Sequence, residues 1–480
     1  MLTTLAAPAF AGTWYIEDGD ITVKAGETEG TNKVSQGANQ EVEDTDTIIK
    51  NREDTASSNT VTIDANGKND KVEVTLKDVN IDTSSRNKAA VSVTGSGNTT
   101  IKLDGDNHLT GGNGIYSNSS GSLTISGDEN DSLTAQGGDS RNGIYSVSGD
   151  VTISGGTVTA TGGNSTGSYG SGGDGIHSGS LTISGGTVTA TGGGSTGSNG
   201  LGGRGICSDS GGVTISGGST VTANGGNGSD GGSGISSSSG VTVSDGTVTA
   251  NGGNGGNVSG DGIRSDGGVT ISGGTVKAAG GSSGSSNGGS GIYSSVIDLS
   301  GSLELTAKAG SPNGKALSQK GSELDLNAIK EKLGPGAKVT ATDADGKVID
   351  QVPIPRPVEP EGPVIPEESS SSSDGGSAAP STPAFPLPGL TVTDKDGQRI
   401  SYTSTQSGNT LTVCVGRLTA SFRISLAALR QLRAEGIEAI TFQTILCSTT
   451  LSVDELLAMG GEDAEAVLTH RLTDSSLTVG

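Results

Sequence analysis

Two nearly identical stretches decide the fold: "VTISGGTVTATGG" at residues 151–163 and "LTISGGTVTATGG" at residues 181–193. They agree in twelve of thirteen positions. Within each, apolar and polar residues alternate on both sides of a Gly-Gly pair, which is typical of two short, half-buried strands joined by a turn. A strand pair rewritten after thirty residues indicates a repeat architecture, in which each unit stacks on the next.

Gly-Ile dipeptides extend the repeat in both directions. Their isoleucines are Ile115, Ile144, Ile176, Ile206, Ile235, Ile263 and Ile292, at spacings of 28 to 32 residues. Each is followed by a "VTIS"-like strand, a "TVTA"-like strand and a loop rich in Gly, Ser and Asn. One such coil cannot bury its own apolar face, so neighbours must stack in register. The sequence therefore predicts an all-β solenoid, a right-handed parallel β-helix of about 30-residue coils, with about nine or ten coils.

The alternation also assigns the two faces of each strand, because successive side chains point to opposite sides. Val151, Ile153, Val158 and Ala160 should point inward. The same inward set recurs in the neighbouring coils, which would form continuous aliphatic columns. The residue after each Gly-Ile should point outward.

Composition limits the function classes. The 480 residues include 84 Gly and carry a formal net charge of −23, which opposes binding to nucleic acid. No run of eighteen apolar residues exists, so no membrane span is expected. Three cysteines cannot build a disulfide framework, and no metal-binding spacing accompanies them in the sequence. Cys414 and Cys447 either pair with each other or remain thiols.

The chain divides into five segments. Residues 1–11 end in Ala9-Phe10-Ala11, which indicates the remnant of a signal peptide and a secreted or cell-surface protein. Residues 12–56 should cap the β-helix, which spans 57–350 together with a C-terminal cap. Residues 351–389 hold ten of the thirteen prolines and predict a linker. Residues 390–480 mix strand and helix patterns and predict a small α+β module.

Two outward columns could carry function. The column after each isoleucine contains Tyr116, Tyr145, His177, Arg264 and Tyr293. Aromatic rings with polar tips are common at recognition surfaces, so these five residues are the candidate carbohydrate-binding set. The alternative is that the rings cover the loops beside them.

The column before each Gly-Ile contains Asn113, Asn142, Asp174 and Asp261. Carboxylate and amide oxygens are the ligands that Ca²⁺ prefers, which makes these four residues candidate metal ligands. The alternative is that they cap backbone N–H groups at turns.

The repeats "GDGIHSGSLTISGGTVTATGG" (173–193) and "GDGIRSDGGVTISGGTVKAAGG" (260–281) resemble those of carbohydrate-binding, pectate-lyase-like right-handed β-helix proteins secreted by clostridia. The resemblance covers about residues 57–310. It implies calcium and a polysaccharide partner, pectic or cellulosic. The Asp of "GDGI" stands at 174 and 261 but is replaced by Asn142, Arg204 and Ser233 in other coils.

No order of Ser, His and Asp or of Cys and His predicts a catalytic triad. The leading hypothesis is a secreted or cell-surface polysaccharide-binding protein without catalysis. The alternatives are a structural surface protein or adhesin that displays its loops to a protein partner, and a polysaccharide lyase.

Overall fold

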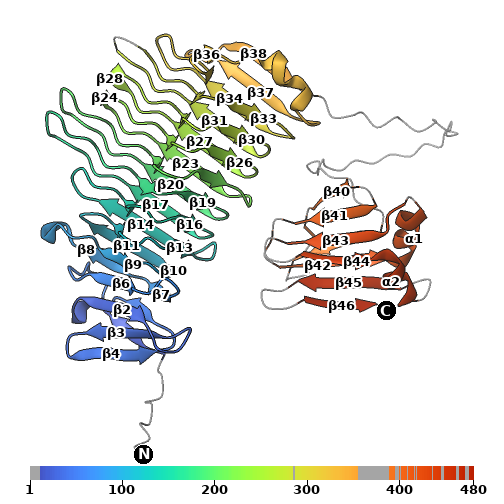
Figure 1. The fold of residues 1–480 in the computed structure, drawn as a ribbon, viewed down its shortest axis with the longest axis horizontal. Helices are drawn as coiled ribbons and strands as arrows, with labels where there is room; N and C mark the ends of the chain where they lie inside the picture. The colour runs from blue at the N-terminus through green and yellow to red at the C-terminus, as the bar shows by residue number, and fades with distance from the viewer. Residues whose placement is uncertain are drawn as a thin grey trace, which may run out of the picture. The chain divides into compact units, whose positions relative to one another are not determined.

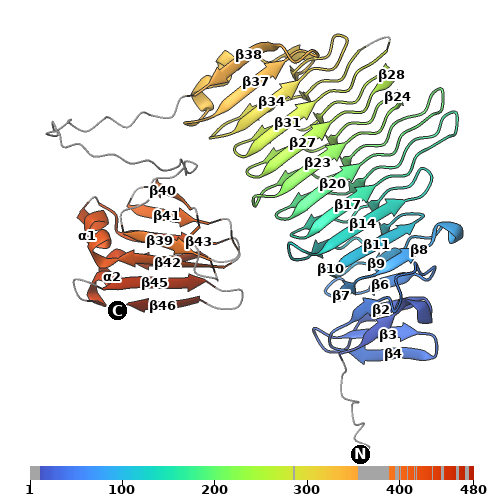
Figure 2. The same cartoon turned by 180° about the vertical axis from the view of Figure 1, so that it is seen from behind.

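The computed structural model describes residues 11–284 and 287–354, and in the C-terminal part 389–394, 399–400, 402–407, 409–415, 417, 419–434, 436–444, 448–460, 464–470 and 475–479. The predicted signal remnant, except Ala11, and most of the predicted linker lie outside these residues. The chain forms two compact units, Met1–Glu359 and Pro360–Gly480. Figures 1 and 2 show the two units.

The first unit is a parallel β-helix of about 12 turns, which confirms the predicted fold class. Each full coil contributes one strand to each of three sheets, called sheets A, B and C here. Sheet A follows the Gly-Ile dipeptides, in the order β36 (Ser322–Glu323), β35 (Leu317–Gln319), β32 (Ile292–Ser294), β29 (Ile263–Ser265), β25 (Ile235–Ser237), β21 (Ile206–Ser208), β18 (Ile176–Ser178), β15 (Ile144–Ser146), β12 (Ile115–Ser117), β9 (Val91–Gly95), β6 (Val61–Ala65), β2 (Ile21–Ala25), β3 (Asn32–Gln36) and β4 (Asn39–Asp44).

The "VTIS" strands build sheet B and the "TVTA" strands build sheet C. Sheet B contains β1 (Thr13–Tyr15), β5 (Ile48–Lys50), β7 (Lys71–Lys77), β10 (Asn98–Asp104), β13 (Leu123–Ser126), β16 (Val151–Ile153), β19 (Leu181–Ile183), β22 (Val213–Ile215), β26 (Val241–Val243), β30 (Val269–Ile271) and β33 (Ile297–Leu299). Sheet C contains β8 (Asn80–Asp82), β11 (Asp106–Gly111), β14 (Ser132–Gly137), β17 (Thr157–Thr161), β20 (Thr187–Thr191), β23 (Thr220–Asn224), β27 (Thr247–Asn251), β31 (Thr275–Ala279), β34 (Glu304–Lys308), β37 (Lys338–Thr342) and β38 (Val348–Pro353). Two of the longer loops pair through β24 (Gly228–Asp230) and β28 (Gly255–Val258).

The core consists of the aliphatic columns that the alternation predicts. Val151, Ile153, Val158 and Ala160 are each 0% exposed. Ile153 pairs with Ile183 of the next coil in direct register, and the same pairing continues along sheet B. Because each column is buried between its neighbours, the apolar face of one coil is completed by the coils on both sides.

The N-terminal end of the β-helix differs from the expectation. The prediction of nine or ten coils was too low, because β1, β2 and β5 from residues 12–56 already pair in parallel with the stack. The count leaves out residues 12–56, because the sequence predicts that they form a cap. The antiparallel strands β3 and β4 continue sheet A beyond β2. At the other end lie a 3-10 helix, η3 (Leu326–Lys332), and the antiparallel edge strand β38. Two shorter 3-10 turns are η1 (Ile16–Asp18) and η2 (Ser84–Arg86).

Glycine is required at two places in the coils that carry a "GG" turn and a Gly-Ile dipeptide. The second glycine of the "GG" turn adopts a positive φ, as at Gly156 (76°) and Gly186 (75°), a conformation that costs other residues energy. The glycine before each isoleucine lies against backbone instead. A Cβ at Gly175 would stand 2.6 Å from the Thr191 amide nitrogen and 2.7 Å from the Gly205 carbonyl oxygen. This contact explains why the Gly-Ile dipeptide marks the repeat.

The second unit has two four-stranded sheets with their own buried core. One contains β39 (Leu390–Thr393), β42 (Ala420–Ser425), β45 (Glu465–His470) and β46 (Ser475–Val479), and the other β40 (Thr403–Ser407), β41 (Thr410–Cys414), β43 (Ala439–Gln443) and β44 (Ser448–Ser452). The unit also contains two helices, α1 (Leu426–Ala434) and α2 (Val453–Ala458), whose buried residues belong to the same core. The predicted α+β module is therefore confirmed.

Candidate functional site

The candidate carbohydrate-binding residues share one face of sheet A. Tyr116, Tyr145, His177 and Cys207 occupy the same position on β12, β15, β18 and β21, where each pairs with the next in direct register. Ser236, Arg264 and Tyr293 continue the column on β25, β29 and β32. The isoleucine before each column residue is fully buried, and the serine after it is buried as well. Outward residues one coil apart in the sequence thus become direct neighbours, because the coils stack in parallel.

The N-terminal part of this column is aromatic. The ring centroids of Tyr116 and Tyr145 are 5.7 Å apart, and the His177 ring stands edge-on to Tyr145 at 5.0 Å. Tyr116 and Tyr145 also line a groove of about 510 Å³. Its other lining residues are Thr60, Thr62, Asn87, Lys88, Ala89, Ser92, Gly112, Asn113 and Arg141. The groove therefore combines two aromatic rings with amide, hydroxyl and cationic groups.

The candidate calcium ligands form a hydrogen-bonded ladder. The Oδ1 atoms of Asn113, Asn142 and Asp174 accept the backbone N–H groups of residues 142, 174 and 204 at 2.9, 2.7 and 2.6 Å. Asp261 accepts the N–H of Ser290 in the same way at 2.6 Å. Each side chain thus caps the equivalent position of the following coil. These contacts match the backbone-capping alternative, and they use one oxygen of each residue that Ca²⁺ would need.

The remaining carboxylate oxygens of the two aspartates also have partners. Asp174 Oδ2 lies 2.7 Å from His177 Nδ1, and Asp261 Oδ2 accepts from Arg264 at 3.2 Å. Burial raises the pKa of Asp261, although the Ser290 and Arg264 contacts oppose the shift. The Arg264 guanidinium also stacks over Tyr293 at 4.7 Å from the ring centroid, an arrangement that stabilises both side chains.

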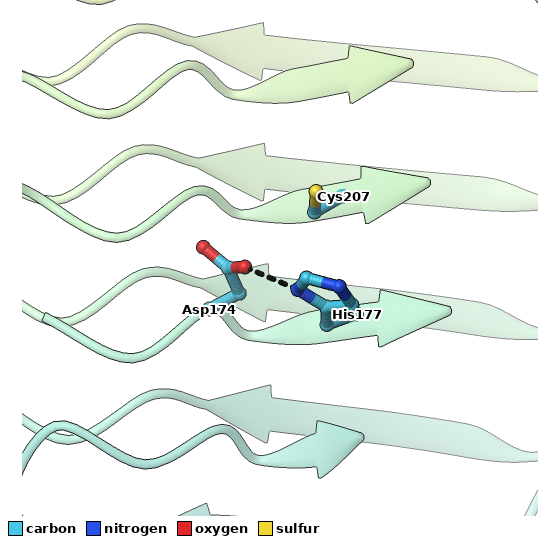
Figure 3. Close-up of side chains that lie close together, drawn as sticks. All are labelled: Asp174, His177 and Cys207. Atoms are coloured by element: carbon cyan, nitrogen blue, oxygen red, sulfur yellow. Dashed lines mark hydrogen bonds and ion pairs between the residues drawn. The ribbon is translucent and has the colours of Figure 1, made fainter. Parts of the chain in front are cut away.

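A group of reactive side chains lies where the ladder meets the aromatic column. Asp174, His177 and Cys207 place a carboxylate oxygen, an imidazole nitrogen and a thiol sulfur within 4.8 Å of one another. Figure 3 shows Asp174 and His177 on one coil and Cys207 on the next. His177 Nε2 lies 2.8 Å from Asp209 Oδ2, and Arg204 Nη1 donates to Cys207 Sγ at 3.1 Å.

The electrostatics of this group centre on His177. Burial lowers the pKa of His177, but its contacts with Asp174 and Cys207 outweigh burial and raise the pKa to about 11. Burial raises the pKa of Asp209, but the contacts of this carboxylate with His177 and Cys207 outweigh burial and lower the pKa. The His177 and Asp174 side chains keep only 16% and 12% of their surface exposed. A compact cluster of charged and polarisable groups therefore sits just below the surface of sheet A.

Cys207 follows Ile206 and so belongs to the same outward column as His177. The ligands come from two coils, so no metal-binding spacing is visible along the chain. The sequence pattern did not predict that Asp209 and Arg204 belong to this cluster. The signal was their position: both lie within three residues of Cys207, one coil after Asp174 and His177. Cys207 and Cys414 are free thiols, and Cys447 lies outside the described residues.

Comparison with known proteins gives no further assignment. No family model matches the chain, and neither the curated proteins nor the solved structures contain a match. The resemblance to clostridial β-helix proteins therefore stays a prediction. Among the described residues, no helix is long and apolar enough to cross a membrane.

Proposed function

We propose that this chain is a non-catalytic polysaccharide-binding protein, exported to the cell surface or beyond. The observation that carries the proposal is the Tyr116–Tyr145 groove. The two rings, 5.7 Å apart and tilted by 52° to each other, can each contact the C–H face of a sugar ring, while nearby polar groups can bond to sugar hydroxyls. Asn113, Lys88 and Arg141 line the same groove and supply hydrogen-bond donors.

The charge of the chain decides between neutral and acidic polymers. A net charge of −23 repels an acidic glycan, and dissolved salt screens this repulsion. The two cations at the groove offset the repulsion only locally. We therefore expect neutral, cellulosic polymers to bind more tightly than polygalacturonate. Calcium bridging by Asp174 or Asp261 would instead make pectic polymers bind more tightly than neutral ones. The bridge stays a prediction, and it competes with the bonds that both residues already make to their neighbours.

Affinity electrophoresis through gels that contain a soluble cellulose derivative tests the proposal. The double variant Tyr116→Ala with Tyr145→Ala should lose retention by about tenfold or more, as expected when central aromatic contacts are truncated. Tyr169→Ala is the matched control, because Tyr169 is 81% exposed in a loop of the same β-helix. Equal retention of the double variant and the control would contradict the groove as the binding site.

Two further measurements separate the alternatives. Release of unsaturated products would favour a lyase. Absence of both retention and products across neutral and acidic glycans would favour the adhesin alternative, in which the β-helix displays its loops to a protein. Repeating the polygalacturonate gel with calcium and with EDTA tests the bridge: equal retention in both removes calcium from the proposal.

A further inference from the structure

The Asp174, His177 and Cys207 cluster combines oxygen, nitrogen and sulfur donors. Asp174 and His177 come from the coil that contains β18, and Cys207 is the register partner of His177 on β21. All three donor atoms lie within 4.8 Å of one another. We propose that these three residues form a binding site for a divalent transition metal of the zinc class.

The donor chemistry selects the class of metal. Thiolate and imidazole ligands suit zinc and its neighbours in the first transition row, whereas Ca²⁺ takes oxygen ligands only. Zinc bonds to sulfur, nitrogen and oxygen at about 2.0–2.3 Å, so movements of about 1 Å in the side chains would bring the donors to tetrahedral separations. Three protein ligands leave the fourth position for water or an exogenous group.

Neighbouring groups already hold two of the ligands in orientation. Asp174 Oδ1 is fixed by the backbone N–H of Arg204 at 2.6 Å, which turns Oδ2 toward His177. His177 Nδ1 faces that oxygen, and Nε2 faces Asp209 at 2.8 Å. A metal at Nδ1 would therefore leave Nε2–H to donate to the Asp209 carboxylate. This carboxylate–histidine–metal arrangement is a common feature of protein metal sites.

Two cationic groups oppose the ion. His177 must lose the proton that its raised pKa retains before it can bind a metal, and Arg204 lies against the thiol. Its guanidinium donates to Cys207 Sγ at 3.1 Å and places positive charge against the sulfur that would bind the metal. Arg204 is an exposed residue, so its side chain can turn into solvent when an ion arrives. Removing the guanidinium should then strengthen metal binding. If ion pairs alone held the Asp174, His177 and Cys207 cluster together, the same change would weaken the cluster.

The neighbouring coils supply substitutions that the stack already accepts. Asn142, Tyr145 and Ser236 occupy the positions of Asp174, His177 and Cys207 in adjacent coils. Asp174→Asn keeps the oxygen that caps the Arg204 amide, and His177→Tyr and Cys207→Ser restore side chains found one coil away. These variants should fold, which far-UV circular dichroism and the melting temperature will check.

Cobalt is the probe, because a thiolate bound to tetrahedral Co²⁺ gives a near-ultraviolet charge-transfer band. The full chain carrying Cys414→Ser and Cys447→Ser retains Cys207 as its one thiol. We expect this protein to bind one equivalent of Co²⁺ with that band and to release it when Zn²⁺ is added. Binding without the band, or no binding at all, would overturn the proposal.

Zinc competition then tests the individual ligands in the same background. Asp174→Asn, His177→Tyr and Cys207→Ser should each weaken binding about 100-fold or more, at or above the loss seen when an outer-sphere partner is removed. Arg204→Ser, which copies Ser233, should tighten binding. Unchanged affinity in Cys207→Ser, or weaker binding in Arg204→Ser, would count against the site. None of these readouts depends on glycan binding, so the metal site and the proposed function can fail separately.

Discussion

Replacing Gly175 with alanine should destabilise the middle of the β-helix. The new Cβ would lie 2.6 Å from the Thr191 amide nitrogen and 2.7 Å from the Gly205 carbonyl oxygen. That oxygen accepts the N–H of Ile176 at 2.9 Å, so the backbone cannot yield without weakening the ladder between two coils. Overpacking of this kind costs about 1–3 kcal/mol.

Gly194→Ala is the matched control. A Cβ at Gly194 would meet its nearest atoms, Asn164 Oδ1 and the Asn227 carbonyl oxygen, at 3.5 Å, which is ordinary van der Waals contact. Because alanine restricts the unfolded chain more than glycine does, this change should be neutral or stabilise by up to about 1 kcal/mol. The two variants add the same methyl group to the same loop-rich repeat and differ in what the methyl group meets.

Hydrogen exchange measured by mass spectrometry localises the effect. A loss of about 1–3 kcal/mol corresponds to exchange about 5–150 times faster in peptides that cover residues 170–215. Peptides from the second unit should not change, because that unit has its own core. If Gly175→Ala left protection unchanged, or if Gly194→Ala reduced it as much, close backbone approach would not be the reason for the Gly-Ile repeat.

Three other perturbations test the same fold. Ile183→Asp should cost about 3 kcal/mol or more, because it buries an unpaired charge in the aliphatic column, whereas Thr182→Asp on the outward face should have little effect on the melting temperature. Deleting residues 151–180 removes one whole coil and should leave a folded protein by circular dichroism, since "LTIS" then replaces "VTIS"; a deletion of half that length should not. The Arg86 hydrogen bond lowers the pKa of Asp20, so its contribution to stability is present above the unfolded pKa of about 4 and is lost as the pH falls through the lower folded value. In urea titrations followed by the fluorescence of the single tryptophan, Asp20→Asn should therefore lower stability by less than about 1 kcal/mol at pH 6, and the difference should disappear in acid.

Most of the β-helix could be predicted because its rules are local and periodic. Alternation assigned Val151 and Ile153 to the core, and both are fully buried. The N-terminal end escaped because it breaks the period. Strand β2 stacks in parallel on β6 without a Gly-Ile dipeptide, and only burial of its apolar residues against the next coil reveals that it belongs to the stack.

The aromatic column was also predictable, since register follows from the isoleucines. The contacts within the column were not. Periodicity places His177 beside Cys207, but rotamers decide that His177 reaches Asp174 on one side and Asp209 on the other. The same limit applies to the Asn and Asp column. Residue type allowed either calcium binding or backbone capping, and only the side-chain geometry shows the capping bonds of the ladder.

The stack itself does not require the residues of the proposed metal site. Asparagine meets the capping requirement at position 142, tyrosine fills the outward position at 145, and serine does so at 236. Two adjacent coils nevertheless depart from these choices together, with Asp174 and His177 on one coil and Cys207 on the next. In a solenoid, each outward position has neighbours in only two other coils, so donors on adjacent coils are the ones that can meet. Ion pairs explain why Asp174 lies beside His177, and the proposed metal would also explain why a thiol joins them.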